Sequence, residues 1–293
     1  MEKRIKKIGI IGATGMLGKP VVNALLSEGF EVYAMVKNID KAKLELPSGV
    51  ILIEGEMANP IDIENFLNNV EAVHLNLSIK QEELQSEFHT EEQGLKLFLE
   101  IAQRKNIKRI SYLSSLVMQY QGMNGFDWWV FKIKLNAVEQ IKNSRIPYAI
   151  FYPSNFMENF LNIQKDGNKV FLAGTSHFKM YYISGEDYAR QVANSYKILE
   201  MENKEYTVQG LNALNADEAA KIFVQCYKKE KLKIAKAPLF IIRILGKFKS
   251  KFFYASKIIE ALNNYPEKFQ SENTWKELGK PILTIEEYAA KFT

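Results

Sequence analysis

The 293-residue chain contains little cysteine and histidine, and each shortage excludes a class of protein. A single cysteine, Cys226, excludes an internal disulfide framework and is typical of a reducing compartment. The three histidines, His74, His89 and His177, lie far apart in the sequence, so no metal site is predicted. His74 falls in an apolar strand pattern, where we expect it to have a structural role.

Long hydrophobic runs are also lacking. The apolar stretch 234–245 contains Lys236, Pro238 and Arg243, and is too short and too charged to span a bilayer. The basic residues near the start of the chain do not indicate a signal peptide, because the apolar run after them is short and interrupted by glycine. The sequence therefore predicts a soluble, cytoplasmic protein without stable membrane insertion. Its 47% hydrophobic and 25% charged residues are ordinary for that class.

The most informative feature present is a glycine pattern near the N-terminus. Gly12, Gly15 and Gly18 follow a short apolar run, 8–11, and precede an apolar-periodic segment, 21–26. Between a strand and a helix, such glycines permit a tight turn and a close approach to a pyrophosphate. The N-terminus of the helix offers free N–H groups and a partial positive charge to the phosphates. The pattern predicts a dinucleotide-binding loop.

Strand and helix patterns alternate through the first half of the chain. We expect strands at 8–11, 30–36, 50–53, 72–77, 110–113 and 148–152, and helices at 21–27, 62–67, 91–104 and 131–142. In the less regular second half we expect strands at 170–172, 179–183 and 206–209, and helices at 186–199 and 216–227. The alternation predicts an α/β fold, a Rossmann-type doubly wound parallel sheet with a smaller C-terminal α/β substrate lobe. The expected domains are an NAD(P)-binding domain, 1–153, and the lobe, 154–293, of which roughly 184–209 returns to the sheet.

A lysine ends the second predicted strand. A carboxylate at this place would bind the ribose 2′-OH of NAD, but the chain has Lys37, with Lys41 shortly after it. A cation favours the 2′-phosphate of NADP through direct charge pairing. We therefore predict NADP(H) as the cofactor, with Lys37 and Lys41 as phosphate contacts. The alternative for both is a solvated lysine in a surface loop.

Taken together, the motifs resemble the NmrA-like group of atypical short-chain dehydrogenases/reductases. The resemblance covers roughly residues 5–220 and rests on Gly12-Ala-Thr-Gly-Met-Leu-Gly18, Val36-Lys37-Asn38, Tyr112-Leu-Ser-Ser115, the segment 146–153, Asn155-Phe-Met-Glu-Asn159 and the segment 183–189. It implies that the cofactor is held by Gly12, Thr14, Gly15, Met16, Leu17 and Gly18 at the pyrophosphate, Glu56 and Met57 beside adenine, Leu77 and Ser78 at the ribose, and Ser114, Tyr152, Pro153, Asn155 and Phe156 towards the nicotinamide. Glu56 and Met57 depart mildly from the Asp and Leu usual in the family.

The chain departs from the wider superfamily at the catalytic tyrosine. These enzymes use a Tyr-x-x-x-Lys pair, in which the lysine holds the nicotinamide ribose and lowers the tyrosine pKa. The resemblance places the lysine at Lys134, but Val130 stands where the tyrosine is expected and cannot donate a proton. Lys134 and Ser115 are the predicted catalytic residues, as a ribose contact and a hydrogen-bond donor to a substrate carbonyl. The alternatives are an exposed helix lysine and a strand-end turn.

Two adjacent tryptophans, Trp128 and Trp129, precede Lys134 by one to two helical turns. They are expected either to wall an apolar substrate pocket or to divide between the core and an interface. Three tyrosines elsewhere are weak candidates for the missing acid: Tyr120, Tyr148 and Tyr182.

A basic segment, 227–259, contains ten lysines or arginines and one acid, Glu230, with aromatic residues interleaved. Such a segment can sit on an anionic membrane or bind nucleic acid. We expect instead a helical lid with solvated lysines and no nucleic-acid partner, because Pro238 fits a helix start and apolar residues follow it at helical spacing. In that arrangement four side chains are buried against the body of the protein: Phe240, Ile241, Ile244 and Leu245.

The sequence thus predicts an NADPH-dependent reductase of a small apolar carbonyl, quinone or enone. The alternative is a non-catalytic NADP(H)-binding redox sensor that acts on a protein partner, which the missing tyrosine favours. The aromatic residues and the full second lobe favour the enzyme with its small-molecule substrate. A nucleotide-sugar epimerase ranks third, because it normally relies on the same missing tyrosine.

Overall fold

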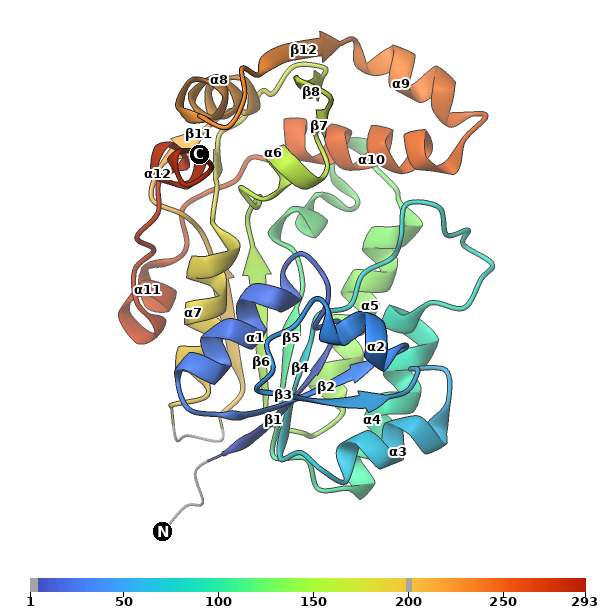
Figure 1. Cartoon of the computed structure of the whole chain (residues 1–293). Helices are drawn as coiled ribbons and strands as arrows, with labels where there is room; N and C mark the ends of the chain where they lie inside the picture. Colours follow the sequence, from blue (N-terminus) through green and yellow to red (C-terminus); the bar gives the residue numbers. More distant parts are fainter. Residues whose placement is uncertain (1–4, 199–201) are drawn as a thin grey trace.

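A seven-stranded parallel sheet lies at the centre of the computed structural model, which describes residues 5–198 and 202–293 (Figure 1). Its strand order is β10-β6-β5-β4-β1-β2-β3. The strands are β1 (Lys7–Ile11), β2 (Glu31–Val36), β3 (Val50–Glu54), β4 (Ala72–Leu75), β5 (Arg109–Leu113), β6 (Tyr148–Pro153) and β10 (Lys204–Val208). The predicted Rossmann-type doubly wound sheet is confirmed.

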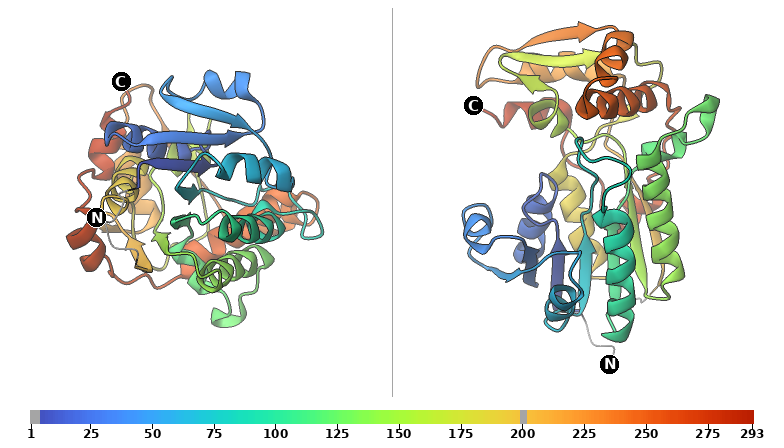
Figure 2. Two further views of the ribbon diagram at one scale, coloured as in Figure 1. Left: turned by 90° about the horizontal axis from the view of Figure 1, so that it is seen from below. Right: turned by 90° about the vertical axis from the view of Figure 1, so that its right-hand side faces the viewer.

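Helices cover both faces of this sheet (Figure 2). One face carries α1 (Gly18–Ser27) and α7 (Gly185–Ser195), which share an apolar cluster with the strands. The other carries α3 (Pro60–Leu67), α4 (Leu95–Arg104) and α5 (Trp129–Asn143), whose buried side chains form a second cluster. The short helix α2 (Ile39–Lys43) follows β2. Because both faces are covered, the strands are apolar on both sides, as parallel strands usually are.

His74 lies on β4 and is completely buried. Its Nδ1 is 2.8 Å from the Ser111 hydroxyl on β5, and burial lowers the pKa of His74 to about 3. The ring therefore stays neutral inside the sheet, in agreement with the structural role expected of it.

The second half of the chain adds smaller elements above the carboxyl ends of the strands. A three-stranded sheet has the order β12-β8-β7, and β11 pairs with β9. The strands are β7 (Lys165–Asp166), β8 (Lys169–Ala173), β9 (Met180–Tyr181), β11 (Ala213–Leu214) and β12 (Lys233–Ala237); the helices are α6 (Asn159–Asn162), α8 (Ala216–Cys226), α9 (Leu239–Gly246), α10 (Ser250–Asn264), α11 (Glu272–Leu278) and α12 (Ile285–Ala290). A third apolar cluster, around Phe160, Phe223 and Tyr288, joins α6, α8 and α12 with β8 and β9. Leu278 of α11 belongs instead to the cluster of α1 and α7. The helix predicted at 186–199 ends as α7 at Ser195, and Leu199 lies outside the described residues.

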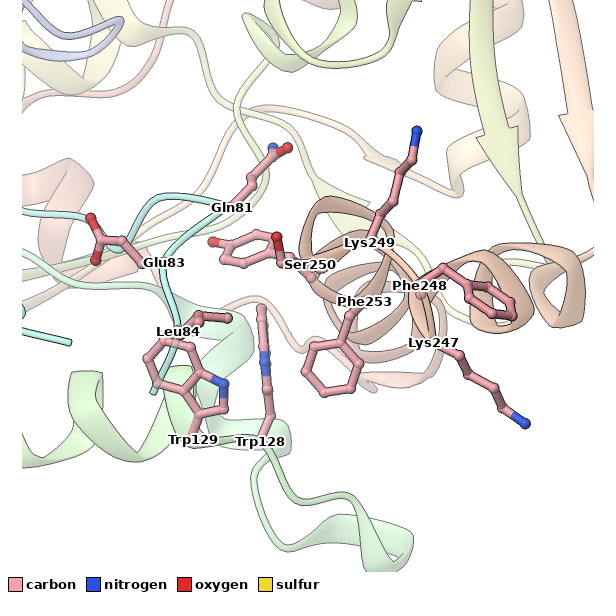
Figure 3. A pocket seen from close by; sticks show the side chains of 12 residues that line it. Gln81, Glu83, Leu84, Trp128, Trp129, Lys247, Phe248, Lys249, Ser250 and Phe253 are labelled. Atoms are coloured by element: carbon pink, nitrogen blue, oxygen red, sulfur yellow. The ribbon is translucent and has the colours of Figure 1, made fainter. Parts of the chain in front are cut away.

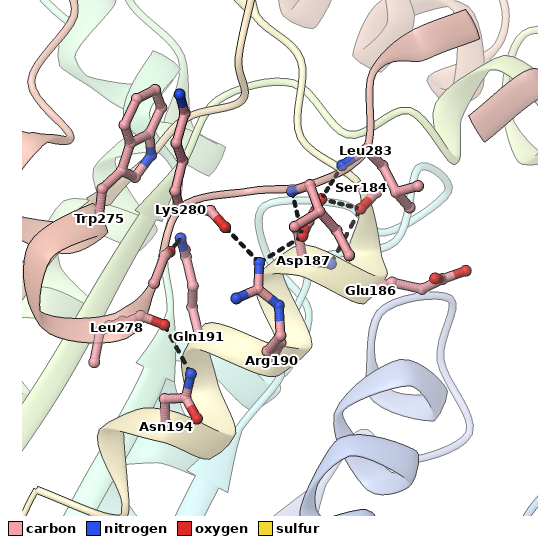
Figure 4. A network of polar contacts seen from close by, with 12 residues as sticks. Ser184, Glu186, Asp187, Arg190, Gln191, Asn194, Trp275, Leu278, Lys280 and Leu283 are labelled. Atoms are coloured by element: carbon pink, nitrogen blue, oxygen red, sulfur yellow. Dashed lines mark hydrogen bonds and ion pairs between the residues drawn. The ribbon is translucent and has the colours of Figure 1, made fainter. Parts of the chain in front are cut away.

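The C-terminal part of the chain returns along α7 (Figure 4). Asp187 accepts the backbone N–H groups of Ile282 and Leu283, both at 3.0 Å. One turn further, Arg190 donates to the Lys280 carbonyl at 2.7 Å, and Gln191 donates to the Gly279 carbonyl at 2.8 Å. These hydrogen bonds tie residues 279–283 to the Rossmann sheet layer, and they give Asp187 a structural role.

The burial expected of the basic segment is wrong. Phe240, Ile241, Ile244 and Leu245 keep 60%, 40%, 51% and 40% of their surface exposed. The segment does form a helix after Pro238, α9, but this helix rests on α10 through its opposite face, where Gly246 lies against the backbone of Phe253. The four apolar side chains named above therefore face the solvent. No helix within the described residues is both long and apolar enough to cross a bilayer, and the compartment stays a prediction.

Candidate dinucleotide and substrate site

The glycine loop leaves no room for side chains at two positions. Gly12 has a φ of +84°, and a Cβ there would overlap the carbonyl oxygen of Asn76. A Cβ on Gly18 would overlap the carbonyl oxygen of Gly12. The Asn76 side chain, which follows β4, also donates to the Gly12 carbonyl at 3.2 Å. No sequence motif indicates Asn76, which fixes the shape of the loop between two neighbouring strands.

The N-terminus of α1 has no side-chain cap and no acidic residue in its first turn. Other helices in the described chain do have such caps, from Asn38 on α2, Asn59 on α3 and Ser184 on α7. An uncapped N-terminus at the carboxyl end of β1 leaves N–H groups and a positive dipole end for an anion. Thr14, Met16 and Leu17 lie half-buried in the loop before it. The described residues therefore fit the pyrophosphate of a dinucleotide.

The predicted phosphate contact Lys37 comes directly after β2 and is exposed. Its Nζ lies 3.3 Å from Oε1 of Glu56, the residue predicted beside adenine after β3. Lys41 is exposed on α2, where its backbone N–H is bound by the Asn38 side chain. The structure thus brings Lys37 and Glu56 together at one edge of the sheet, with a carboxylate beside the cation that is to bind a phosphate.

The remaining predicted cofactor contacts divide into accessible and buried groups. Ser78 is exposed after β4, whereas Met57 and Leu77 are buried in the apolar core with only an edge available. The Ser114 hydroxyl donates to the Met118 sulfur at 3.3 Å, and Ser115 precedes the 3₁₀ turn Leu116–Tyr120.

Side chains after β6 mostly make contacts inside the fold. The Tyr152 hydroxyl donates to Glu205 on β10 at 2.6 Å, on a neighbouring strand and not towards the loop. Pro153 ends β6, and Asn155 accepts a hydrogen bond from Asn159 at 2.6 Å. The Phe156 ring packs on Tyr188, 5.5 Å between centroids. These positions stay predictions as cofactor contacts.

Lys134 is part of a buried polar cluster. Its Nζ donates to Oε1 of Glu91 at 2.7 Å, and the Tyr112 hydroxyl donates to the same oxygen at 2.5 Å. Glu91 is completely buried, and its Oε2 has no partner among the described residues. Burial and the neighbouring Glu91 carboxylate raise the pKa of Tyr112 well above its usual range. Lys134 is therefore a positioned cation and not a freely solvated helix lysine.

Glu91 reaches this position from a π-helical turn, Thr90–Gly94, that precedes α4. Such turns often occur at functional sites, because they redirect one side chain out of the helical register. Sequence reasoning missed Glu91 and the role of Tyr112. The acidic residue stands 43 positions before Lys134 in the chain, and no local pattern relates the two.

A pocket of about 320 Å³ opens beside this cluster (Figure 3). Its apolar lining comes from Leu84, Trp128, Trp129, Phe248, Phe253 and Tyr254, and its polar lining from Gln81, Glu83, Lys247, Lys249 and Ser250. Trp129 stacks on His89 at 5.0 Å, and His89 is also 3.0 Å from the Glu83 carboxylate. Residues 81–84 follow β4 and the tryptophans follow β5, so the pocket lies over the carboxyl ends of these strands, where α/β proteins bind ligands.

Tyr254 of α10 supplies a hydroxyl in this pocket. Its ring makes a T-shaped contact with Trp128, 4.9 Å between centroids. Burial raises the pKa of Tyr254 to about 12, and the Glu91 and Glu83 carboxylates add to this shift. Val130, where the usual tyrosine is absent, is buried in the core. The sequence offered no signal for Tyr254, because it comes from a part of the chain outside every recognised motif.

Fold and site together define a Rossmann-type dinucleotide-binding protein. The chain matches the NmrA-like family over residues 4–289, and it belongs to that family. This confirms the resemblance drawn from the motifs and extends it past residue 220, where those motifs end.

The chain is similar in sequence to assembly factors and in structure to reductases. The photosystem II assembly factor Ycf39 of Trieres chinensis is 24% identical over 257 residues, 86% of this chain and 79% of the relative. The NADPH-dependent quinone oxidoreductase QOR2 of Escherichia coli, solved with NADPH, superposes with a TM-score of 0.73 at 19% sequence identity. The superposition covers 97% of this chain and 99% of the oxidoreductase chain. The triphenylmethane reductase of Citrobacter sp., solved with NADP(H), superposes with a TM-score of 0.74 at 17% sequence identity. The superposition covers 98% of this chain and 100% of the reductase chain. At these identities the structures show the fold.

Proposed function

We propose that the protein is an NADPH-dependent reductase of a small, apolar, planar carbonyl compound, such as a quinone or enone. The observation that carries this proposal is the aromatic pocket beside the Lys134–Glu91 pair. Trp128, Trp129 and Phe253 offer flat apolar walls that suit a conjugated ring, and polar groups stand at the rim. The cofactor of the solved quinone oxidoreductase and triphenylmethane reductase supports the choice of NADPH.

Each residue has a defined part in this proposal. The glycine loop and the N-terminus of α1 hold the pyrophosphate, Lys37 holds the 2′-phosphate, and Lys134, aligned by Glu91, holds the nicotinamide ribose. When bound, NADPH would supply a hydride, and water would supply the proton that completes the reduction. Tyr254 keeps its proton at neutral pH, because its pKa is about 12, and donates a hydrogen bond to the substrate oxygen. Ser115 is a second donor to that oxygen.

A turnover screen tests the proposal. Purified protein with NADPH is mixed with quinones, enones and aldehydes, and oxidation of the cofactor is followed. We expect oxidation with at least one conjugated carbonyl compound, and a drop in kcat of about 100-fold in Tyr254→Phe, within the range for loss of one positioned donor. Tyr227→Phe is the matched control, since Tyr227 follows α8 and does not line the pocket.

A second candidate is a non-catalytic NADP(H)-binding protein that acts on a protein partner. Two observations favour it: Val130 replaces the usual catalytic tyrosine, and the curated relatives are named as assembly factors. Tight NADPH binding without oxidation by any compound in the screen would support this candidate against the reductase.

A further inference from the structure

The helix α9 lies at one extremity of the molecule (Figure 1), and large apolar side chains on it are exposed. Five large side chains recur along its outer face and the turn after it, at spacings of three, four and seven residues: Phe240, Ile241, Ile244, Leu245 and Phe248. Each is at least 40% exposed, and Phe248 is 81% exposed. A soluble surface normally carries such residues singly, so a contiguous stripe indicates a binding surface.

Cations lie at one end of this stripe. Lys247 and Lys249 are exposed in the turn between α9 and α10, Lys251 is exposed in the first turn of α10, and no carboxylate pairs with them in the described chain. Arg243, on the side of α9, is held by Glu260 at 3.1 Å. Lys247 and Phe248 border the pocket, and Figure 3 shows their side chains pointing away from Trp128 and Trp129, towards the outside of the molecule.

We propose that the α9–α10 turn docks the protein on an anionic lipid surface. Phe240, Ile244 and Phe248 enter the boundary between headgroups and acyl chains, while Lys247, Lys249 and Lys251 meet lipid phosphates. The charge pattern argues for this occupant: an apolar stripe that ends in three uncompensated lysines is complementary to a surface with negative charge around an apolar interior. The helix is eight residues long, so the association is peripheral. Lys247, Phe248 and Lys249 also line the candidate substrate pocket, but the docking itself requires neither cofactor nor turnover.

Sedimentation with vesicles tests the docking. The full chain is mixed with vesicles of phosphatidylcholine alone or mixed with phosphatidylglycerol, at low and moderate salt. We expect binding to the anionic vesicles that weakens with salt. Lys247→Gln/Lys251→Gln is expected to weaken it about 25-fold, about fivefold for each lysine, and Phe240→Ser/Ile244→Ser more than about tenfold.

Two control variants match these changes elsewhere on the surface. Lys6→Gln/Lys96→Gln removes two exposed lysines, and Leu44→Ser/Ile61→Ser removes two side chains that are 88% and 66% exposed. Both are expected to sediment like the unchanged protein, with circular dichroism confirming that every variant is folded. Absence of binding to anionic vesicles, or equal losses in the variants and their controls, would overturn the proposal. Turnover of NADPH is not part of this test, so its result stands apart from that of the reductase.

Discussion

Replacing Glu56 by glutamine is expected to sharpen the preference for NADPH. The Glu56 carboxylate lies 3.3 Å from the Lys37 ammonium, so it competes for the cation and repels a 2′-phosphate bound there. Two unit charges 4 Å apart in water interact by about 1 kcal/mol, so Glu56→Gln should tighten NADPH about fivefold. NADH has no 2′-phosphate, and its affinity should stay unchanged.

The Glu56→Gln substitution should change the stability of the fold too little to affect the measured cofactor affinities. The side chains of Lys37 and Glu56 are 69% and 52% exposed, and an exposed ion pair of this kind contributes about 0–1 kcal/mol. The reciprocal variant, Lys37→Ala, removes a charge-assisted contact of about 1.5–3 kcal/mol. The affinity of the protein for NADPH should therefore fall more than about tenfold.

Isothermal titration calorimetry with both cofactors measures these effects. Glu100→Gln, an exposed carboxylate on α4, is the control and should leave both affinities alone. The gain in Glu56→Gln should shrink as salt is raised. Equal changes for NADPH and NADH in Glu56→Gln, or equal affinities of the unchanged protein for both cofactors, would refute the assignment of Lys37 to the phosphate.

Three further predictions follow from buried groups. Lys134→Ala leaves its buried carboxylate partner without a cation and should lower the free energy of unfolding by about 3–5 kcal/mol as well as weaken cofactor binding, whereas Lys132→Ala, on the same helix, should do neither; urea unfolding and calorimetry distinguish them. Gly18→Ala, whose Cβ overlaps the loop carbonyl, should weaken both cofactors alike in the same titration. His74 is neutral when folded, so below its unfolded pKa of about 6.5 its share of stability should fall by about 1.4 kcal/mol per pH unit until about pH 3. The free energy of unfolding is measured against pH in the unchanged protein and in His74→Gln, which should lose this slope. The control His177→Gln, at an exposed site, should keep it.

Local patterns made the dinucleotide half of the fold predictable. Gly12 and Gly18 are required by backbone contacts within one strand–loop–helix unit, and such units show directly in the sequence. The position of Lys134 could be transferred from a motif. Its partner Glu91 could not, because a π-helical turn on another element directs that side chain into the core.

The C-terminal region could not be predicted to the same depth. Apolar residues at helical spacing correctly predicted a helix after Pro238, but apolar residues occur on two faces of α9, and spacing does not tell which face is covered. The contact between Gly246 and α10 decides this, and it depends on packing between elements. Tyr254 reaches the pocket through the same packing, which explains why the sequence offered no sign of it.

The rate of NADPH oxidation with a conjugated carbonyl substrate, compared between the unchanged protein and Tyr254→Phe, tests the central claim most directly. The proposed reductase predicts turnover in the unchanged protein, and about a 100-fold lower kcat with unaltered NADPH affinity in the variant. Tight NADPH binding without oxidation by any quinone, enone or aldehyde would contradict it.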